Sequence, residues 1–372
     1  MKKIGVLTQP LHNNYGGLLQ AYALQKVLKK QGFEVSTVDF TTKSKAPLWG
    51  IKRLLANIVK KYILRRTIKS IYPMTEYEKA EIGQETRRFI AENIKLTQRI
   101  NSLEEFRYLK SYKFDAYIVG SDQVWRPVYS PGISAFFLDF LGDDNKTKRM
   151  SYAASFGIDN CDEYSSTDLT KFSKLAAQFD AVSVREDSAV ELCKNSFSTS
   201  AVQVLDPTML LDMSDYIELV KKDQIPQSEG NLMVYVLDKT EAKSAIIDKV
   251  VKAKGLTPFT VLPESKTGIY PPVTKWLRGF MDAEFIVTDS FHGVAFSIIF
   301  NKPFIAIGNQ YRGLARFTSI LKVFGLQNRL VVTDQELTED KLNWNFDYTK
   351  LNDIRDHERE FSLSFLKDNL SR

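Results

Sequence analysis

The chain is poor in cysteine and has no long apolar run. Cys161 and Cys193 are the only cysteines among 372 residues, and they form no spaced pair or cluster. We therefore expect neither a disulfide framework nor a thiolate zinc site, and a reducing cytoplasm is the natural location. No stretch approaches the ~18–20 apolar residues of a membrane-spanning helix. The apolar run at 4–7 is too short for a signal peptide.

Several motifs that carry known chemistry are also missing. The chain contains no Walker A, H-E-x-x-H, EF-hand or G-x-S-x-G motif, and no cluster with metal-ligand spacing. The N-terminal loop is not G-x-G-x-x-G, so NAD is not expected. Basic residues are not interleaved with aromatic ones as nucleic-acid readout requires. We accordingly expect no metal, no cofactor and no nucleic-acid partner.

The sequence does contain a repeated alternation of apolar strands and amphipathic helices. A strand, a polar loop, a helix and a second strand follow one another within residues 3–40, which predicts a parallel sheet with a right-handed crossover. The alternation restarts after a polar stretch at 214–230, which we interpret as an interdomain connection. We predict an α/β protein with two Rossmann-like domains, 1–213 and 214–372. The last helix, predicted over 348–370, is placed to pack back on the first domain.

Residues 41–75 break this alternation. They contain nine Lys/Arg and no Asp or Glu, and apolar residues recur at helical spacing within 48–70. A basic amphipathic helix of this kind can lie on an anionic membrane surface. A helix that packs its apolar face on the sheet and solvates its charges has the same periodicity. Both interpretations stay open.

The stretch 284–303, EFIVTDSFHGVAFSIIFNKP, carries the most chemistry. Residues 285–288 predict a buried strand, Asp289-Ser290 a helix N-cap, and the following apolar run a buried helix. His292 then falls in the first turn of a helix beyond a parallel strand. Unpaired backbone N–H groups and the positive end of the helix dipole favour an anion there. The alternative is a histidine that merely caps or packs.

Polar residues also follow other predicted strands, at the sheet edge where α/β folds bind ligands. Arg185 suits bidentate binding of phosphate or carboxylate, with an ion pair to a carboxylate such as Asp206 as its alternative. Asp122, beside Trp125, can accept a hydrogen bond or a proton from a sugar hydroxyl. A structural role for Asp122 as a helix N-cap is equally open.

The N-terminal loop at 12–17, HNNYGG, combines amides, a histidine and a tyrosine above the predicted sheet. Such side chains suit hydroxyl-rich ligands, whereas the alternative is a hydrogen-bonded turn that the two asparagines would cap. The candidate ligand-binding residues of this loop are His12, Asn13, Asn14, Tyr15 and Gly16.

Taken in order, six motifs resemble the polysaccharide pyruvyl transferases, over residues 3 to about 330. They are N-Y-G-x-x-L-Q-A-Y-A-L at 14–24, G-S-D-Q-V-W at 120–125, S-Y-A-A-S-F-G at 151–157, V-S-V-R-E at 182–186, D-P-T at 206–208 and T-D-S-F-H-G at 288–293. Any one of these motifs is weak, but six in register are fairly specific.

The resemblance implies a glycosyltransferase B-type architecture, two Rossmann-like domains facing a cleft, with the acceptor on the N-terminal side and the donor on the C-terminal side. It implies transfer of a pyruvyl group from phosphoenolpyruvate to a saccharide as a ketal, in capsule, exopolysaccharide or cell-wall glycan synthesis. The family's essential arginine and histidine match Arg185 and His292. A residue that holds the donor through its backbone matches Phe291.

One departure from the family pattern concerns the donor. Many members have R-L-H where this chain has S-F-H at 290–292, so a donor-anchoring arginine is missing at Ser290, and we expect Arg312 or Arg316 to replace it. Phosphoenolpyruvate is a trianion, and His292 is the expected proton donor to its methylene carbon. Asp122 or His12 would orient or deprotonate the acceptor. The remaining candidate substrate-binding residues are Trp125, Ser155 and Gly293.

Two other functions compete with pyruvyl transfer. A glycosyltransferase that uses a nucleotide-sugar donor would need a carboxylate for the ribose, for which Asp289 and Glu264 are the candidates. The second competing function is that of a non-catalytic saccharide-binding relative. The presence of both Arg185 and His292 argues against it. A lipid-linked acceptor would give the basic segment at 43–70 a purpose at an anionic membrane.

Overall fold

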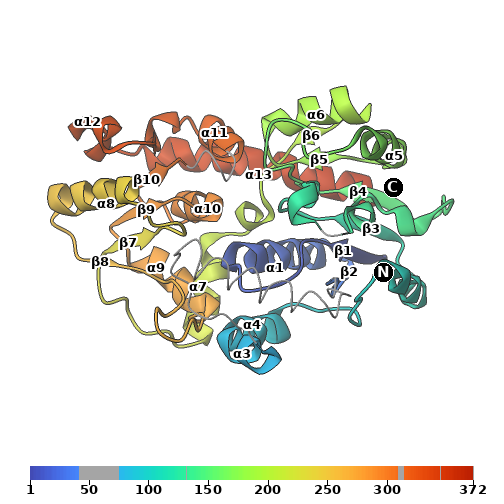
Figure 1. Cartoon of the computed structure of the whole chain (residues 1–372), viewed down its shortest axis with the longest axis horizontal. Helices are drawn as coiled ribbons and strands as arrows, with labels where there is room; N and C mark the ends of the chain where they lie inside the picture. Colours follow the sequence, from blue (N-terminus) through green and yellow to red (C-terminus); the bar gives the residue numbers. More distant parts are fainter. Residues whose placement is uncertain (42–74, 131, 309–313, 344, 372) are drawn as a thin grey trace, which may run out of the picture.

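The computed structural model describes residues 1–41, 75–130, 132–308, 314–343 and 345–371, and it contains two parallel β-sheets surrounded by helices (Figure 1). The basic amphipathic helix predicted near 48–70 and the candidate Arg312 lie outside the described residues. Within the described part of the chain, no helix is long and apolar enough to cross a membrane.

The N-terminal sheet has four strands in the order β2-β1-β3-β4, all parallel. A two-stranded parallel sheet, β5-β6, continues it through isolated bridges that link Met150 to Ala181 and Ala154 to Val184. The strands are β1 (Lys3–Leu7), β2 (Glu34–Thr37), β3 (Ala116–Val119), β4 (Lys148–Ser151), β5 (Ser183–Val184) and β6 (Val202–Gln203).

The C-terminal sheet has five parallel strands in the order β11-β10-β9-β7-β8. Its central strand β9 is apolar and completely buried, as a strand covered on both faces must be. The strands are β7 (Leu232–Tyr235), β8 (Pro258–Phe259), β9 (Phe285–Thr288), β10 (Phe304–Ile307) and β11 (Leu330–Val331). The expected strand at 285–288 is therefore confirmed to the residue.

Helices cover both sheets. The α-helices are α1 (Tyr15–Lys30), α3 (Glu76–Ile82), α4 (Gln84–Asn93), α5 (Ser166–Ala176), α6 (Asp187–Phe197), α7 (Met213–Lys222), α8 (Glu241–Lys254), α9 (Val273–Asp282), α10 (Phe291–Ile299), α11 (Leu314–Val323), α12 (Glu339–Leu342) and α13 (Tyr348–Ser371). Short 3₁₀ turns include η2 (Leu103–Tyr112), η3 (Pro127–Tyr129), η4 (Ile133–Phe137), η5 (Asp139–Leu141), η6 (Pro207–Leu210), η8 (Gln327–Arg329) and η9 (Asp334–Glu336).

The interdomain connection predicted at 214–230 begins with the helix α7. A capping box between Asp212 and Asp215 starts this helix, and Tyr216 and Val220 bury its apolar face. The helix packs against α9 of the C-terminal domain, so the chain changes domain at the turn that precedes α7.

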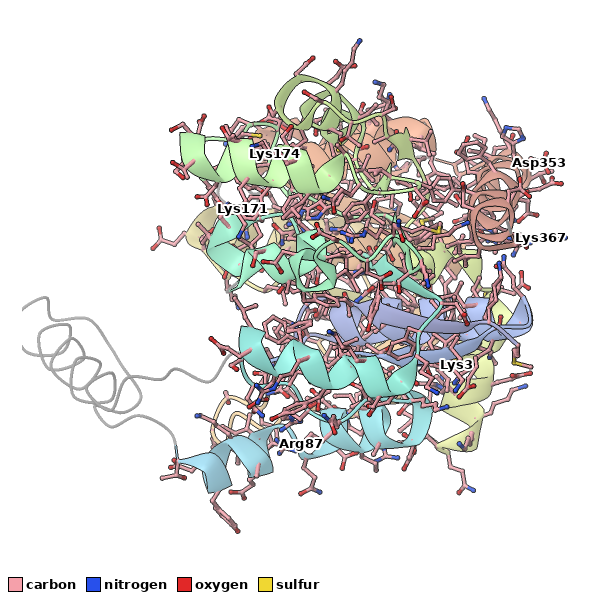
Figure 2. All side chains as sticks on the ribbon, turned by 90° about the vertical axis from the view of Figure 1, so that its right-hand side faces the viewer. Lys3, Arg87, Lys171, Lys174, Asp353 and Lys367 are labelled. Carbon is pink, nitrogen blue, oxygen red and sulfur yellow. The ribbon has the colours of Figure 1, made fainter. Side chains whose placement is uncertain are left out.

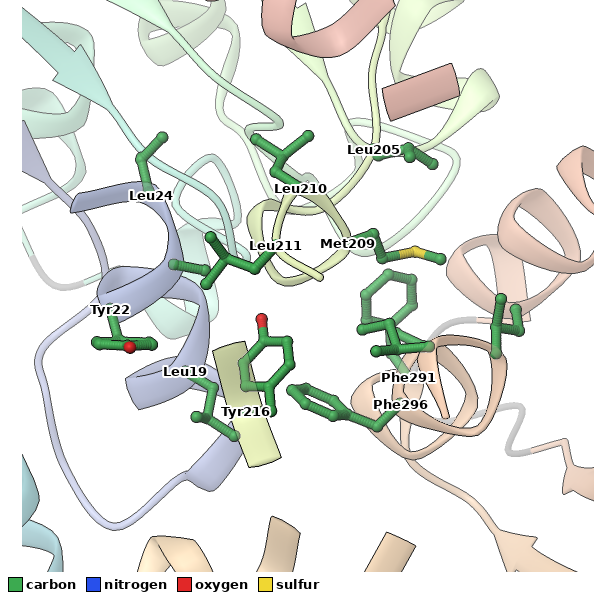
Figure 3. Close-up of a cluster of buried hydrophobic side chains, with 14 of the residues drawn as sticks. Leu19, Tyr22, Leu24, Leu205, Met209, Leu210, Leu211, Tyr216, Phe291 and Phe296 are labelled. Carbon is green, nitrogen blue, oxygen red and sulfur yellow. The ribbon is translucent and has the colours of Figure 1, made fainter. Parts of the chain in front are cut away.

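The two domains share one hydrophobic core around η6, which contacts α1, α10 and α13. Figure 3 shows Leu19 and Tyr22 of α1 on one side of this core and Phe296 of α10 on the other. The Tyr216 and Phe296 rings meet edge to face, with 4.9 Å between their centroids. Because residues of both domains fill this core, burial of apolar surface fixes how the domains are placed.

The last helix, α13, crosses from the C-terminal domain to the N-terminal sheet (Figure 1). The Ser362 hydroxyl accepts a hydrogen bond from the Leu205 amide at 3.0 Å, and the Lys148 ammonium donates to the Asn369 carbonyl at 2.6 Å. Leu366 is buried in the shared core, whereas Lys367 points outward (Figure 2). This helix therefore joins the two domains a second time.

Replacement of Phe296 by alanine tests the shared core. The ring is fully buried and contacts Tyr216, Trp276 and Phe280, so Phe296→Ala should lower the free energy of unfolding by about 3–5 kcal/mol. Urea unfolding followed by circular dichroism measures it. As control, Phe361→Ala removes a ring that is 48% exposed on α13 and should change stability by roughly 0.5 kcal/mol or less. Equal effects of the two changes would contradict the shared core.

Candidate active site

The carboxyl ends of strands from both sheets surround a cleft of about 500 Å³, the position at which open α/β sheets bind ligands. Residues that follow β1 and β3 form its N-terminal wall, and residues that follow β7 and β9, together with α11, form its C-terminal wall. The lining residues are Gln9, Pro10, His12, Asn14, Gly17, Thr41, Asp122, Gln123, Tyr129, Leu237, Asp289, Ser290, Phe291, His292 and Arg316.

Beneath this cleft the buried carboxylate of Asp206 joins residues from both domains. Its Oδ2 accepts hydrogen bonds from the Arg185 Nη1 and the Ser121 hydroxyl, each at 2.9 Å. The same oxygen lies 3.7 Å from His292 Nε2. Its Oδ1 accepts hydrogen bonds from the amide and hydroxyl of Thr208, so Asp206 is the N-cap of η6. Asp206 thus connects the carboxyl ends of β3 and β5 with the first turn of α10.

The surroundings of Asp206 keep it ionised. Burial by itself disfavours the charged form, but the nearby His292, the charge of Arg185 and the hydrogen bond from the Thr208 amide outweigh it. Together they hold the pKa of Asp206 well below its ordinary value. A buried carboxylate is stable in this form because each oxygen has a partner.

Arg185 follows β5 and is buried behind the cleft rather than in its lining. Its guanidinium lies over the Phe291 ring, with Cζ 4.2 Å from the ring centroid. Its Nη2 is 3.9 Å from Asp122 Oδ1, and its Nε is 3.9 Å from Glu186 Oε2. Burial would lower the pKa of Arg185, but Asp206, Glu186 and Asp122 raise it above its ordinary value. The ion-pair alternative for Arg185 therefore describes this structure.

His292 lies in the first turn of α10, as predicted, and lines the cleft. The Ser290 hydroxyl caps the helix by accepting a hydrogen bond from the Gly293 amide at 3.5 Å. Gly16 packs against the imidazole so closely that an added Cβ would lie 2.0 Å from Nδ1, so only glycine fits there. Within the described part of the chain, His292 Nε2 has no hydrogen-bond partner.

Gly293 is required for a similar reason. A Cβ at this position would lie 2.1 Å from the Thr288 hydroxyl, because α10 begins directly against β9. Gly293 and Gly16 therefore act through close packing, which lets the helix start and the histidine ring reach the cleft. Neither glycine lines the cleft itself.

Asp122 lines the cleft with a strained backbone. Its φ of 82° is in the left-handed region, which a non-glycine residue seldom adopts. Its Oδ1 accepts a hydrogen bond from the Gln123 amide at 2.9 Å. The residue does not cap a helix, so its side chain is available to the cleft.

Arg316, on α11, supplies a cation to the cleft. Burial, and next the charge of Arg185, lower the pKa of Arg316 to about 10, so its guanidinium remains charged at neutral pH. Of the two arginines expected to replace the one missing at position 290, Arg316 is thus in the cleft. Arg312 lies outside the described residues.

Some residues of the N-terminal loop at 12–17 line the cleft, and others lie in the domain interior. His12 and Asn14 line the cleft, and the Asn14 side chain does not cap α1 although it occupies the N-cap position. Asn13 and Tyr15 are not among the lining residues. The Asn13 Oδ1 accepts a hydrogen bond from the Thr86 hydroxyl at 2.6 Å. Tyr15 is buried and donates its hydroxyl hydrogen to the Pro271 carbonyl at 2.9 Å across the domain interface.

Two further candidates lie in the interior and not in the cleft. Trp125 is buried, stacks on Phe137 and donates its indole hydrogen to the Phe136 carbonyl at 2.9 Å. Ser155 is also buried and donates its hydroxyl hydrogen to Glu186 Oε1 at 2.8 Å. Both side chains hold the loops behind the cleft, so neither is placed to contact a ligand.

The carboxylates considered for a nucleotide ribose are poorly placed. Asp289 lines the cleft, but its oxygens already accept hydrogen bonds from the Leu237 and Asp238 amides and from the Lys243 ammonium. Glu264 accepts a hydrogen bond from the Thr267 hydroxyl and is not part of the cleft lining. Among the described residues, no group of three His, Cys, Asp or Glu side chains could hold a metal ion.

Comparison with protein-family models identifies the family of this chain. The model for polysaccharide pyruvyl transferases matches residues 14–311, which is most of the chain. The chain belongs to the polysaccharide pyruvyl transferase family. No curated protein matches the sequence significantly.

Solved structures are similar to this family member in fold. Arabidopsis thaliana UGT89C1 complexed with UDP-L-rhamnose has a TM-score of 0.52 at 9% identity, over 99% of this chain and 98% of that one. Medicago truncatula UGT71G1 complexed with UDP-glucose has a TM-score of 0.51 at 10% identity, over 100% and 99%. The UDP-N-acetylglucosamine 2-epimerase of Rickettsia bellii has a TM-score of 0.51 at 10% identity, over 98% of this chain and 96% of that one. These similarities confirm the predicted glycosyltransferase B-type fold.

Sequence reasoning missed several residues of this site. Asp206 was considered only as an ion-pair partner, and Ser121 and Tyr129 were not considered. The signal for Asp206 was present, because D-P-T follows a strand and a Pro-Thr pair after an aspartate is typical of a capped turn. For Tyr129 there was no such signal, since several aromatic residues follow β3.

Replacement of Asp206 by asparagine tests the buried carboxylate. Asp206→Asn leaves Arg185 without its charged partner, so the free energy of unfolding at pH 7 should fall by about 3–5 kcal/mol. The folded-state pKa of Asp206 lies below the unfolded value of about 3.9. Its stabilisation is therefore complete above that value and is lost as the pH falls below it. Urea unfolding should show the two proteins converging as the pH is lowered from 5 to 2.

The matched control is Asp187→Asn. Asp187 pairs with Lys322 at 2.9 Å on the surface, where the side chains are 42% and 69% exposed, so its loss should cost no more than about 1 kcal/mol. A difference between Asp206→Asn and wild type that does not depend on pH would show that the carboxylate charge is not what stabilises this cluster.

Proposed function

We propose that this protein transfers a pyruvyl group from phosphoenolpyruvate to two hydroxyls of a saccharide and forms a ketal. The observation that carries the proposal is one cleft wall on which Arg316, the first turn of α10 and His292 lie together. This combination provides a cation, backbone donors and a proton carrier, which are the groups that transfer from a phosphorylated enol requires. Membership of the family supports the same reaction.

The donor would bind at the start of α10. The amides of Phe291 and His292 lie in the first turn, where no intrahelical acceptor precedes them, and the helix dipole is positive there. Phosphoenolpyruvate carries a carboxylate and a phosphate, so one group can accept from these amides while the other pairs with Arg316.

The chemistry then needs one proton delivered to carbon. The His292 imidazolium would protonate the methylene carbon of the enol, which becomes a methyl group, and the central carbon acquires oxocarbenium character. A saccharide hydroxyl attacks that carbon and loses its proton to Asp122 or His12, both of which line the cleft. The carbon–oxygen bond to phosphate breaks with its electrons on the leaving phosphate. Attack by a second hydroxyl, which also loses a proton, closes the ketal.

Arg185 and Asp206 would act from behind the cleft. Asp206 lies 3.7 Å from His292 Nε2 and stabilises a charged imidazolium there, while Arg185 holds the Asp206 carboxylate at 2.9 Å. This role differs from direct phosphate binding by Arg185, whose side chain is 2% exposed and is not among the residues that line the cleft.

We further propose a cytoplasmic setting, where phosphoenolpyruvate is available, and an acceptor that belongs to a bacterial capsule, exopolysaccharide or cell-wall glycan. A lipid-linked acceptor at an anionic membrane remains part of this proposal. A nucleotide-sugar donor is less well supported, because the hydrogen bonds of Asp289 already occupy the carboxylate that a ribose would need.

Replacement of Arg316 by glutamine tests the donor site. A charge-assisted pair contributes roughly 1.5–3 kcal/mol, so Arg316→Gln should weaken phosphoenolpyruvate binding roughly 10- to 150-fold in isothermal titration. The control is Arg278→Gln, since Arg278 pairs with Asp282 on α9 outside the cleft. UDP titrated into the same proteins should give no signal. Binding of UDP without binding of phosphoenolpyruvate would replace the proposal by a nucleotide-sugar transferase.

Replacement of His292 by glutamine tests the proton donor. His292→Gln should leave the Kd for phosphoenolpyruvate within about threefold of wild type, while loss of general acid catalysis slows transfer roughly 100- to 10,000-fold. Phosphate release can be measured with whichever methyl pyranoside supports the fastest turnover by the wild type. His357→Gln, on the exposed side of α13, is the matched control. Full activity of His292→Gln would rule out this role.

A further inference from the structure

An exposed aromatic ring lies in the N-terminal wall of the cleft. Tyr129 ends the turn η3, lines the cleft and is 45% exposed. The sequence favours Trp125 as the aromatic residue of this wall, but that indole is buried against Phe136 and Phe137. Tyr129 is therefore the aromatic residue that this wall offers to a ligand.

A buried cation holds the Tyr129 ring in place. The Arg126 guanidinium lies against it, with Cζ 4.6 Å from the ring centroid, a distance at which cation–π attraction is effective. Arg126 is itself fixed, because its Nε and Nη2 donate to Glu163 Oε1 at 3.0 and 2.9 Å and its Nη1 donates to Gln123 Oε1 at 3.1 Å. The ring thus has one supported face and an exposed part in the cleft.

The loop that carries the ring is also braced. Gln9 Nε2 donates to the Gln123 carbonyl at 2.8 Å and to the Ser130 hydroxyl at 2.6 Å. Gly157 lies so close to Gln123 that an added Cβ would be 2.0 Å from its Oε1. These contacts join the ends of β1, β3 and β4. Pre-organisation of this kind reduces the entropy that a ligand must overcome on binding.

The polar groups beside Tyr129 match a neutral, hydroxyl-rich ligand. Gln9, His12 and Asn14 line the same wall and offer amide and imidazole donors and acceptors. A pyranose ring has a face of C–H groups and a rim of hydroxyls. The C–H face can pack on an aromatic ring while the rim bonds to such polar side chains.

We propose that this wall is a saccharide subsite in which Tyr129, supported by Arg126, is the platform for a pyranose ring. Its assignment to the acceptor rests on the proposed function. Asp122, seven residues before Tyr129 on the same loop, lines the same cleft, and its Oδ1 is 3.9 Å from Arg185 Nη2. A ring on the platform would therefore share the cleft with Asp122.

Saturation-transfer NMR on the full chain tests the subsite. The probes are methyl glycosides of glucose, galactose, mannose, N-acetylglucosamine and N-acetylmannosamine. At least one should bind the wild type through its C–H face. Tyr129→Ala should weaken that binding roughly tenfold or more, and Tyr129→Phe should keep it within about threefold. The matched control is Tyr108→Ala, since Tyr108 is 43% exposed and has Arg107 Cζ 5.1 Å from its ring centroid, outside the cleft.

Two results would overturn the subsite: no bound glycoside in the wild type, or equal affinity in the wild type and Tyr129→Ala. Phosphoenolpyruvate titrations distinguish failure of the saccharide subsite from failure of the proposed function. If Tyr129→Ala still binds phosphoenolpyruvate but no longer binds the glycoside, the result supports both the saccharide subsite and the proposed function. If the wild type binds the glycoside through Tyr129 but does not bind phosphoenolpyruvate, the platform stands and the pyruvyl donor does not.

Discussion

The buried carboxylate of Asp206 is the contact on which the rest of the site depends. A charge in the interior is tolerated only when it is paired and hydrogen-bonded. Asp206 meets that requirement with groups from four separate segments, namely Ser121, Arg185, Thr208 and His292. The same residue caps η6, which contacts α1, α10 and α13. The Asp206 side chain therefore takes part both in the ion pairing of the site and in the packing between the two domains.

This arrangement makes the geometry of the site depend on the domain interface. His292 belongs to the C-terminal domain and Asp206 to the N-terminal one, so the 3.7 Å between them varies with the placement of the two domains. The core around Tyr216 and Phe296 and the crossing of α13 fix that placement (Figure 3). Apolar burial at the domain interface thus sets the position of the imidazole. In the proposed reaction, a small displacement there would be costly to proton transfer.

The sequence predicted those parts of the fold and of the site whose causes lie in neighbouring residues. The strand at 285–288 and the Ser290 cap have local causes, an apolar β-branched run followed by a hydroxyl residue, and both were predicted. The direction of side chains on loops was not predictable. The left-handed backbone at Asp122 redirects the chain after β3, so that Trp125 enters the core and a later tyrosine reaches the cleft. Likewise, neither asparagine of the N-terminal loop caps α1, because Asn13 is held by Thr86 from a helix distant in sequence.

Ser290 shows how a departure from the family pattern can be consistent with the same proposed chemistry. A serine at the N-cap accepts a hydrogen bond from the third amide of its helix, which an arginine cannot do, and so it fixes the start of α10. The first amides of the helix stay available for an anion. In the proposed donor site, Arg316 on α11 would supply the positive charge that an arginine would bring at this position, and its pKa of about 10 leaves it charged at neutral pH. Burial and the like charge of Arg185 depress that pKa, and the negative charge of the proposed donor beside Arg316 would raise it.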